Sequence, residues 1–265
     1  MKPILFNTEM VKAILEGRKT VTRRVVKPQP DERHQHKLGY VTDSTNKKEI
    51  GCFGFGIDEY GGNIQYAKPP YRVGDILYVR ETWCKLPVSE YGNFCTGGEG
   101  IYYYKADGEK RPQGWRAGWK PSIHMPKEAA RLFLRVTGVR VERLQDITEE
   151  QAKAEGVCHL FDDLPDNEYT RWCKSVGKYP KEKSEWSYKN YLWYGNFGEC
   201  GSGNWRSDNW EYQYSGYDTA KGSFSSLWES TLNKNQIDTY GWNANPYVWV
   251  IEFEDISEDI KNGRL

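Results

Sequence analysis

The chain has 265 residues, long enough for one elaborated domain or two small ones with a sizeable hydrophobic core. Lysine and arginine together number 37, as do aspartate and glutamate, so the formal net charge is zero. A neutral chain argues against a protein that coats nucleic acid by bulk charge, although it leaves room for a local basic face. Aromatic residues make up 15% of the chain, either as packing beneath long loops or as surfaces on which bases stack.

The six cysteines are scattered and include no C-x-x-C pair, which argues against a structural zinc site. No run approaches the roughly 18 apolar residues of a transmembrane helix. The first residues also lack the long apolar region of a signal peptide. We therefore expect no metal, no cofactor and no membrane partner, with reduced thiols in a cytoplasmic setting. The sequence leaves the oligomeric state unknown.

The first predicted elements are a strand over residues 3–6 and a helix directly after it. Asn7 or Thr8 caps this helix, because a short side-chain oxygen accepts from an amide of the first turn. Gly17 ends the helix, since glycine readily adopts the left-handed backbone conformation there. Residues 20–26 follow as a strand, and the prolines beyond it stop that strand.

The middle of the chain predicts two more strands. Gly74 and Asp75 form a turn before a strand over residues 76–79. Apolar and polar residues then alternate from Leu132 to Val136. After Gly138 the phase of this alternation flips, which is what a one-residue bulge at a glycine produces.

The last predicted elements begin with a capping box. Thr148 is the N-cap residue and Gln151 stands three positions later, so their side chains satisfy each other's backbone amides. Gly156 ends this helix. A short helix around residues 224–228 and a closing strand over residues 247–253 complete the pattern.

The predicted fold class is α+β: a small PUA-like β-barrel with short flanking helices and long loop insertions. We expect one domain over residues 1–265, with three insertions rich in glycine, tyrosine, aspartate and asparagine. Long loops of this kind are usually surface elaborations or functional segments. The core segments are about 1–30, 71–83, 121–157 and 223–256, and the insertions are about 31–70, 84–120 and 158–222.

Four segments together resemble the ASCH superfamily, whose fold is PUA-like. The most recognisable is Ile14–Thr22, with its G-x-K-T-x-T core, and the others are Val73–Leu77, Leu144–Gly156 and Val248–Phe253. The resemblance covers roughly half of the chain, which also looks like the larger members encoded by bacteriophages and prophages. The insertions have no counterpart in the smallest members, so they are the main departure from the family pattern.

The resemblance implies a function, because small ASCH amidohydrolases remove the acetyl group of N4-acetylcytidine. Their lysine and threonine correspond to Lys19 and Thr22, and their helix-borne glutamate corresponds to Glu155. The arginine two positions after the threonine corresponds to Arg24. The resemblance thus predicts a metal-independent hydrolase of nucleoside N-acyl groups. Lys19, Thr22 and Glu155 would be catalytic and Arg24 would bind the substrate.

The residues alone allow the same chemistry but leave it open. A hydroxyl beside an amine that loses its proton in a dry pocket is a workable pair of nucleophile and base. Lys19 and Thr22 lie three positions apart and would face opposite sides of a regular strand, so they converge only if the backbone before Thr22 is irregular. The plainer interpretation is an exposed lysine, a threonine that fills a strand, and for Glu155 a solvated glutamate at a helix end.

Phe6 and Trp83 stand in or beside the recognised core segments and are the predicted aromatic surfaces for a nucleobase, unless they are simply core residues. Basic residues concentrate at positions 17–37 and 105–143, as phosphate contacts would require, or as solvated strand faces do. Two alternatives to the hydrolase therefore stay open. One is a non-catalytic module that binds RNA, DNA or a modified base, and the other is a ribonuclease.

Overall fold

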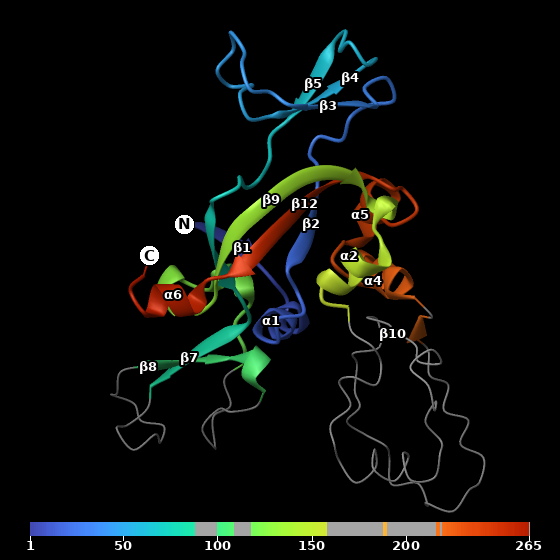
Figure 1. Cartoon of the computed structure of the whole chain (residues 1–265). Helices are drawn as coiled ribbons and strands as arrows, with labels where there is room; N and C mark the ends of the chain where they lie inside the picture. The colour runs from blue at the N-terminus through green and yellow to red at the C-terminus, as the bar shows by residue number, and fades with distance from the viewer. Residues whose placement is uncertain (88–99, 109–117, 158–187, 190–215, 218, 265) are drawn as a thin grey trace, which may run out of the picture. The chain divides into compact units, whose positions relative to one another are not determined.

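The computed structural model describes residues 1–87, 100–108, 118–157, 188–189, 216–217 and 219–264 (Figure 1). This part of the chain is of the α+β class, as predicted. It divides into two compact units: the first is Met1–Val141 with Trp249–Leu265, and the second is Glu142–Val248. Within the described ranges no helix is long and apolar enough to cross a membrane.

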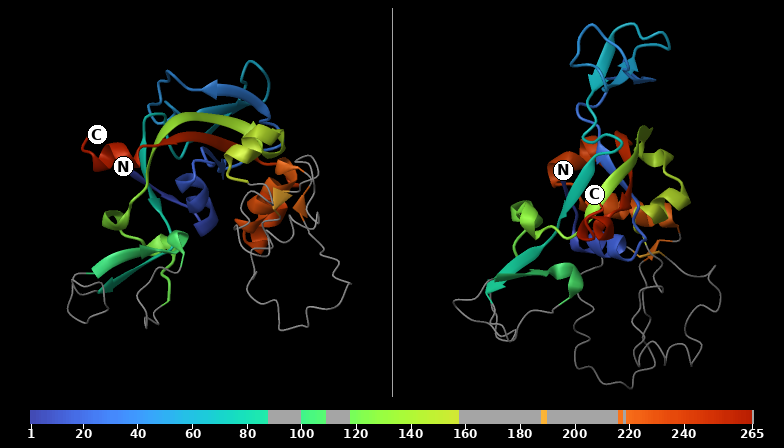
Figure 2. Two further views of the ribbon diagram at one scale, coloured as in Figure 1. Left: turned by 60° about the horizontal axis from the view of Figure 1, so that its bottom comes forward. Right: turned by 60° about the vertical axis from the view of Figure 1, so that its left-hand side comes forward.

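The principal sheet is built from strands far apart in the sequence. β1 pairs in parallel with β6, and β6 pairs antiparallel with β9. The long bent strands β9 and β12 run side by side in both views of Figure 2. In spatial order the sheet consists of β1 (Lys2–Leu5), β6 (Ile76–Arg80), β9 (Phe133–Arg143), β12 (Tyr247–Asp255) and β2 (Val21–Val25).

The first helix, α1 (Thr8–Leu15), begins and ends as the sequence predicts. Asn7 is its N-cap residue, and the Asn7 Oδ1 atom accepts from the Met10 amide at 2.8 Å. Gly17 has a φ angle of 72°, the left-handed conformation that glycine adopts without steric penalty. The helix buries one apolar face: Met10, Val11, Ala13 and Ile14.

Strand β9 shows the predicted change of phase. Alternate residues are buried from Leu132, just before the strand, to Val136, and the next buried residue is Val141, so the buried side switches parity around Gly138. A Cβ atom at Gly138 would lie 2.7 Å from the Glu252 Oε2 atom. The Glu252 side chain therefore lies directly against Gly138, where the phase of burial changes.

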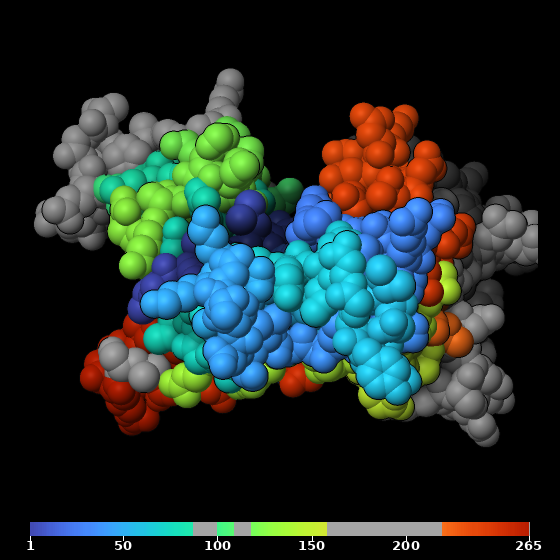
Figure 3. Space-filling view, turned by 90° about the horizontal axis from the view of Figure 1, so that it is seen from above, coloured from blue at the N-terminus to red at the C-terminus, as the bar shows by residue number. Residues whose placement is uncertain are grey.

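The insertion at residues 31–70 contains a sheet, whereas the sequence indicates only loops. β3 (His36–Tyr40), β4 (Phe53–Gly56) and β5 (Ile64–Ala67) pair antiparallel in that order. β4 reads Phe-Gly-Phe-Gly and is buried throughout, so it lacks the apolar–polar alternation that identifies a strand. Figure 3 looks onto these segments, coloured blue to cyan. Tyr40 packs in a stacked arrangement with Trp249 at a ring separation of 6.4 Å.

The insertion at residues 84–120 carries a β-hairpin. β7 (Trp83–Pro87) pairs antiparallel with β8 (Gly100–Tyr104). The 3-10 helix η1 (Lys105–Asp107) follows the hairpin and lies against α1. The remaining short helices of the first unit are η2 (Ser122–His124), η3 (Lys127–Ala129) and α6 (Ser257–Lys261).

The second unit is built around two packed helices, α2 (Glu149–Ala154) and α4 (Ala220–Ser230). The predicted capping box of Thr148 and Gln151 is present, and α2 ends before Gly156 as expected. The Glu149 carboxylate accepts from the amides of the first two residues of α4 at 2.8 and 3.2 Å. The unit also contains η4 (Leu144–Asp146), α5 (Lys234–Tyr240) and the strand pair β10 (Tyr188–Lys189) and β11 (Gly216–Tyr217).

Candidate functional site

The candidate site in the first unit begins where α1 ends. The amides of Arg18 and Lys19 both donate to the Ala13 carbonyl, at 2.8 and 3.0 Å. These bonds turn the chain sharply beneath the helix before β2 begins at Val21. The backbone before Thr22 is therefore not a regular strand. This is the local irregularity that Lys19 and Thr22 need in order to approach each other.

Lys19 is buried, with 2% of its surface exposed. Its Nζ atom donates to the Val21 carbonyl at 2.7 Å and lies 5.5 Å from the centre of the Phe6 ring. A buried ammonium group is rare without a partner that compensates for its lost hydration. The interpretation of Lys19 as an exposed loop lysine is therefore wrong.

Thr22 is 1% exposed, and its hydroxyl oxygen accepts a hydrogen bond from Arg24. Arg24 lies two residues along β2, on the same face, and its Nη1 atom donates to Thr22 Oγ1 at 2.9 Å. Arg24 also donates to the Leu5 carbonyl at 3.1 Å, and its guanidinium carbon lies 5.4 Å from the centre of the Phe6 ring. The structure thus links Lys19, Phe6, Arg24 and Thr22 through contiguous contacts.

Phe6 is the centre of this cluster. It follows β1, its amide donates to the Arg80 carbonyl at 3.2 Å, and only 2% of its surface is exposed. Its ring lies 6.2 Å from that of Phe253 and carries the contacts with the cations of Lys19 and Arg24. In this conformation Phe6 positions two cations and does not offer an open stacking surface.

Glu155 belongs to the second unit, where it is the C-cap residue of α2. It is 3% exposed, so it is not the solvated helix-end glutamate of the plainer interpretation. Its neighbours behave differently, because Glu149 caps α4 and Glu150 is exposed. Burial supports a specific role for Glu155, and its participation in the same site as Lys19 stays a prediction.

Trp83 lies in another cluster of the first unit. It is 6% exposed and packs with Met125, Ala129 and Tyr102, at a ring separation of 5.7 Å from Tyr102. The Lys120 ammonium lies over its ring at 5.0 Å. Trp83 therefore contributes to the base of the β7–β8 hairpin.

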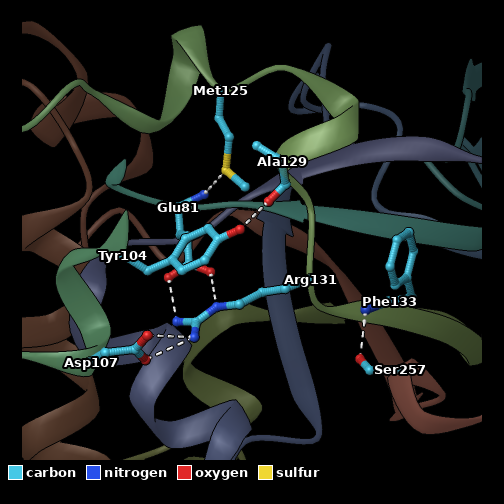
Figure 4. A network of polar contacts seen from close by, with 8 residues as sticks. All are labelled: Glu81, Tyr104, Asp107, Met125, Ala129, Arg131, Phe133 and Ser257. Atoms are coloured by element: carbon cyan, nitrogen blue, oxygen red, sulfur yellow. Dashed lines mark hydrogen bonds and ion pairs between the residues drawn. The ribbon is translucent and has the colours of Figure 1, made fainter. Parts of the chain in front are cut away.

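The sequence alone did not indicate an ion network at the start of β7 (Figure 4). The Arg131 guanidinium donates to both Glu81 oxygens at 2.8 and 3.0 Å and to both Asp107 oxygens at 2.8 Å. The Tyr104 ring lies 4.0 Å from the guanidinium carbon. No local signal identifies this network, because Glu81 and Arg131 are fifty positions apart. An arginine in an alternating pattern of apolar and polar residues predicts only a solvent-exposed strand face.

Burial dominates the electrostatics of this network. Glu81 is 1% exposed, and burial raises the pKa of its carboxyl group even though the Arg131 guanidinium opposes the shift. Burial also raises the pKa of Tyr104 to about 12. Its hydroxyl donates to the Ala129 carbonyl at 2.7 Å. The guanidinium, both carboxylates and the phenol are all engaged, as a structural network requires.

A second unpredicted pair precedes β3. His34 Nδ1 lies 2.7 Å from Asp31 Oδ1, and the hydrogen bond from His34 lowers the pKa of the Asp31 carboxyl group. His34 is 8% exposed, and its Nε2 atom is buried without a hydrogen-bond partner. Within the described ranges no group of three or more histidine, cysteine, aspartate or glutamate side chains is arranged to hold a metal ion.

Comparisons with protein-family models, curated proteins and solved structures found no match for this chain.

Proposed function

We propose that the chain is a metal-independent amidohydrolase that removes an N-acyl group from a cytosine-type nucleoside, with a PUA-like barrel of the ASCH type as its core. The observation that carries the proposal is the cluster of three buried residues, Lys19, Phe6 and Thr22, with the half-buried Arg24. The resemblance of Ile14–Thr22 to the ASCH signature supports it further.

The hydrogen bonding of Thr22 suits a nucleophile. Because Thr22 Oγ1 accepts from Arg24, its own proton remains available to a base. In the proposed reaction Lys19, in its neutral form, takes that proton as Oγ1 attacks the acyl carbonyl carbon. The amino group of the cytosine then leaves with the proton that Lys19 took up. Water hydrolyses the acyl-threonine ester to release the carboxylic acid. Glu155 is proposed to orient the pair or to carry a proton.

The roles of Arg24 and Phe6 follow from their contacts. Arg24 is half-buried and extends between the Thr22 hydroxyl and the Leu5 carbonyl, where its guanidinium can also anchor a substrate oxygen. Phe6 fixes the positions of both cations. The proposal needs the Lys19 amine to leave the Val21 carbonyl when substrate binds.

The test is release of cytidine from N4-acetylcytidine by the purified protein, followed by chromatography. We expect Lys19→Met and Thr22→Val to lower the rate by about 10²–10⁴-fold, because each removes a group that transfers or donates the reacting proton. Thr22→Ser keeps the hydroxyl and should retain activity. The matched controls Lys27→Met and Thr20→Val alter exposed side chains of the same segment and should leave the rate unchanged.

Two results would exclude this mechanism. One is a wild-type protein that releases no cytidine. The other is a Lys19→Met or Thr22→Val protein that is folded, as judged by its circular dichroism melt, and hydrolyses the substrate at the wild-type rate. Glu155→Gln tests the third predicted catalytic group in the same assay.

A non-catalytic reader of a modified base is the second candidate. The hydrogen bond from Lys19 Nζ to the Val21 carbonyl favours it, because it engages the amine with the backbone instead of with the Thr22 hydroxyl. A reader would bind N4-acetylcytidine in equilibrium dialysis and return it unchanged. Incubation of the protein with single-stranded RNA, followed by electrophoresis, tests the ribonuclease alternative.

A further inference from the structure

One face of the β7–β8 hairpin combines aromatic rings with cations. Directly opposite residues of an antiparallel pair share a face, and here Trp83 is opposite Tyr104 while Lys85 is opposite Tyr102. Lys120 joins the same face, because its backbone bridges that of Trp83 on the other side of β7. Figure 1 shows β7 and β8 as neighbouring strands of this hairpin.

Two lysines of this face hold their ammonium groups over aromatic rings. Lys120 Nζ lies 5.0 Å from the centre of the Trp83 ring, and Lys85 Nζ lies 5.0 Å from that of Tyr102. Both lysines are exposed. Considering only the part of the chain that the structure describes, neither has an acidic partner, whereas Lys2 pairs with Asp75 at 2.6 Å. The rings thus restrict two ammonium groups whose charges are not neutralised by a described carboxylate.

The Trp83 ring adds an unused donor at the same place. Trp83 is 6% exposed, and its Nε1 atom is buried without a hydrogen-bond partner in the described structure. Buried donors are almost always satisfied, so an unpaired indole N–H beneath an ammonium group points to an acceptor that binds there. An anionic oxygen is the acceptor that would satisfy both the indole and Lys120.

The hairpin is also held rigidly at its base. Arg131 joins Glu81, just before β7, to Asp107, just after β8, and it carries the Tyr104 ring at 4.0 Å. The guanidinium is occupied by two carboxylates, so it fixes the platform and is not itself a binding group. Lys85 and Lys120 therefore project from a preorganised surface, which lowers the entropy lost when an anion binds.

We propose that this face of the hairpin binds the phosphates of a single-stranded polynucleotide. This inference rests on the proposed function, and it specifies that the substrate base belongs to a strand. Lys85 and Lys120 contact successive phosphates, and the Trp83 indole donates to a phosphate oxygen beside Lys120. A bilayer is the less suitable partner. Ile101, the exposed apolar residue of β8, pairs with Leu86 and so lies on the opposite face from the lysines.

The test is fluorescence anisotropy of a short fluorescein-labelled single-stranded RNA across a range of salt concentrations. We expect the double variant Lys85→Gln/Lys120→Gln to bind about tenfold more weakly at low salt. Its slope of log affinity against log salt should fall by about 1.4, which is two phosphate contacts at about 0.7 each. The matched control Lys47→Gln/Lys48→Gln removes two exposed lysines elsewhere in the first unit and should bind like the wild type.

A further variant isolates the indole. Trp83→Phe keeps an aromatic ring beneath Lys120 and removes the donor, so it should weaken RNA binding without changing the salt slope. The inference is overturned if the lysine double variant binds RNA as tightly and with the same slope as the wild type. It is equally overturned if the two lysines are required for binding to phosphatidylserine vesicles and not for binding to RNA.

The assay with free N4-acetylcytidine separates this inference from the proposed function. The lysine double variant should hydrolyse the free nucleoside at the wild-type rate, because the two lysines contact only the strand. Loss of RNA binding with hydrolysis intact therefore supports both proposals. If neither the wild type nor the lysine double variant hydrolyses the nucleoside, the proposed chemistry is rejected. RNA binding that depends on Lys85 and Lys120 would still support the phosphate site.

Discussion

The β7–β8 hairpin places cations over aromatic rings in two different ways. At its base, Arg131 lies over Tyr104 and is bonded to both carboxylates of Glu81 and Asp107. Along its face, Lys120 lies over Trp83 and Lys85 lies over Tyr102, with no acidic partner among the described residues. The ring contact is alike in the two regions, and what differs is the use of the remaining hydrogen-bonding capacity.

This difference separates a structural role from a binding role. Four of the five N–H donors of the arginine bind Glu81 and Asp107, and its charge faces two carboxylates, so it is already committed to the fold. The Trp83 indole keeps a donor without a partner, and among the described residues Lys85 and Lys120 have ring contacts but no carboxylate partner. A cation over an aromatic ring is therefore informative about function only after its other partners have been counted.

The largest expected effect is on stability, at the base of the hairpin where Arg131 is bonded to Glu81 and Asp107. Arg131→Met leaves the buried Glu81 carboxylate without its partner, and we expect the free energy of unfolding to fall by about 3 kcal/mol. The matched control is Arg135→Met, four residues further along the chain in β9, which breaks the more exposed pair with Glu254 and should cost less than about 1 kcal/mol. Urea unfolding measures both. Equal losses would show that the network at the base of the hairpin has no special structural role.

The pH dependence of this loss sharpens the comparison. Burial raises the pKa of Glu81 in the folded state, so its carboxyl group favours folding most when protonated and loses that contribution as the pH rises through the folded pKa. Arg131 opposes this rise in pKa, so its removal should raise the pKa of Glu81 further and increase the stability lost at neutral pH. The difference in unfolding free energy between wild type and Arg131→Met should narrow as the pH falls below the ordinary glutamate pKa, because the raised pKa favours the protonated form of Glu81 there. The double variant Glu81→Gln/Arg131→Met lacks the titrating carboxyl group. Its free energy of unfolding, from the same urea titrations, should therefore depend on pH much less than that of Arg131→Met.

Substitutions on the face of the hairpin should change the stability of the fold only slightly. Lys85→Gln/Lys120→Gln removes two exposed cation–π contacts, each worth about 0.5 kcal/mol, so the midpoint of urea unfolding should move little. A destabilisation as large as that of Arg131→Met would mean that these lysines support the fold. The distinction between the two regions would then be lost, whatever the RNA measurements gave.

The smallest expected effect concerns Asp31 and His34, a pair between the two extremes. The Asp31 carboxylate is exposed, and the hydrogen bond from His34 lowers its pKa. Its contribution to stability is present above the ordinary carboxyl pKa and is lost as the pH falls through the folded value. NMR titration should place the Asp31 midpoint below that of an ordinary aspartate. His34→Ala should return it toward that value, and an unchanged midpoint would remove the pair from consideration.

Local signals in the sequence predicted the local structure. Asn7 and Gly17 bound α1, and the pair of Thr148 and Gln151 opens α2, because caps depend on side chains within a few positions of the helix end. The phase change at Gly138 was visible for the same reason, since burial of alternate residues is written directly in the strand.

Pairings between distant residues were not predictable in this way. The parallel pairing of β1 with β6 brings together segments about seventy positions apart, and the Glu81–Arg131 pair spans fifty. The sheet at residues 31–70 was missed because its central strand is buried on both sides and half glycine. These features depend on the tertiary fold, which overrides local propensity.

The candidate site was predicted only in part. The ASCH-like signature selected Lys19, Thr22 and Arg24, which the structure shows as buried or half-buried members of one cluster around Phe6. Spacing alone favoured an exposed lysine, because burial of Lys19 depends on how the chain turns after α1. The sequence leaves Trp83 as either a surface for a base or a core residue, and the structure shows its packing with Met125, Ala129 and Tyr102.

The Glu149 carboxylate has a consequence for how the second unit tolerates change. It joins the first residue of α2 to the first turn of α4, which begins about seventy positions later in the chain. Because the two helices are fastened directly, the segment between them need not set their spacing. Closing a longer connection adds only a slowly growing entropy penalty. This point of the fold is therefore suited to accept, exchange or shed inserted sequence while the helix pair beneath it is retained.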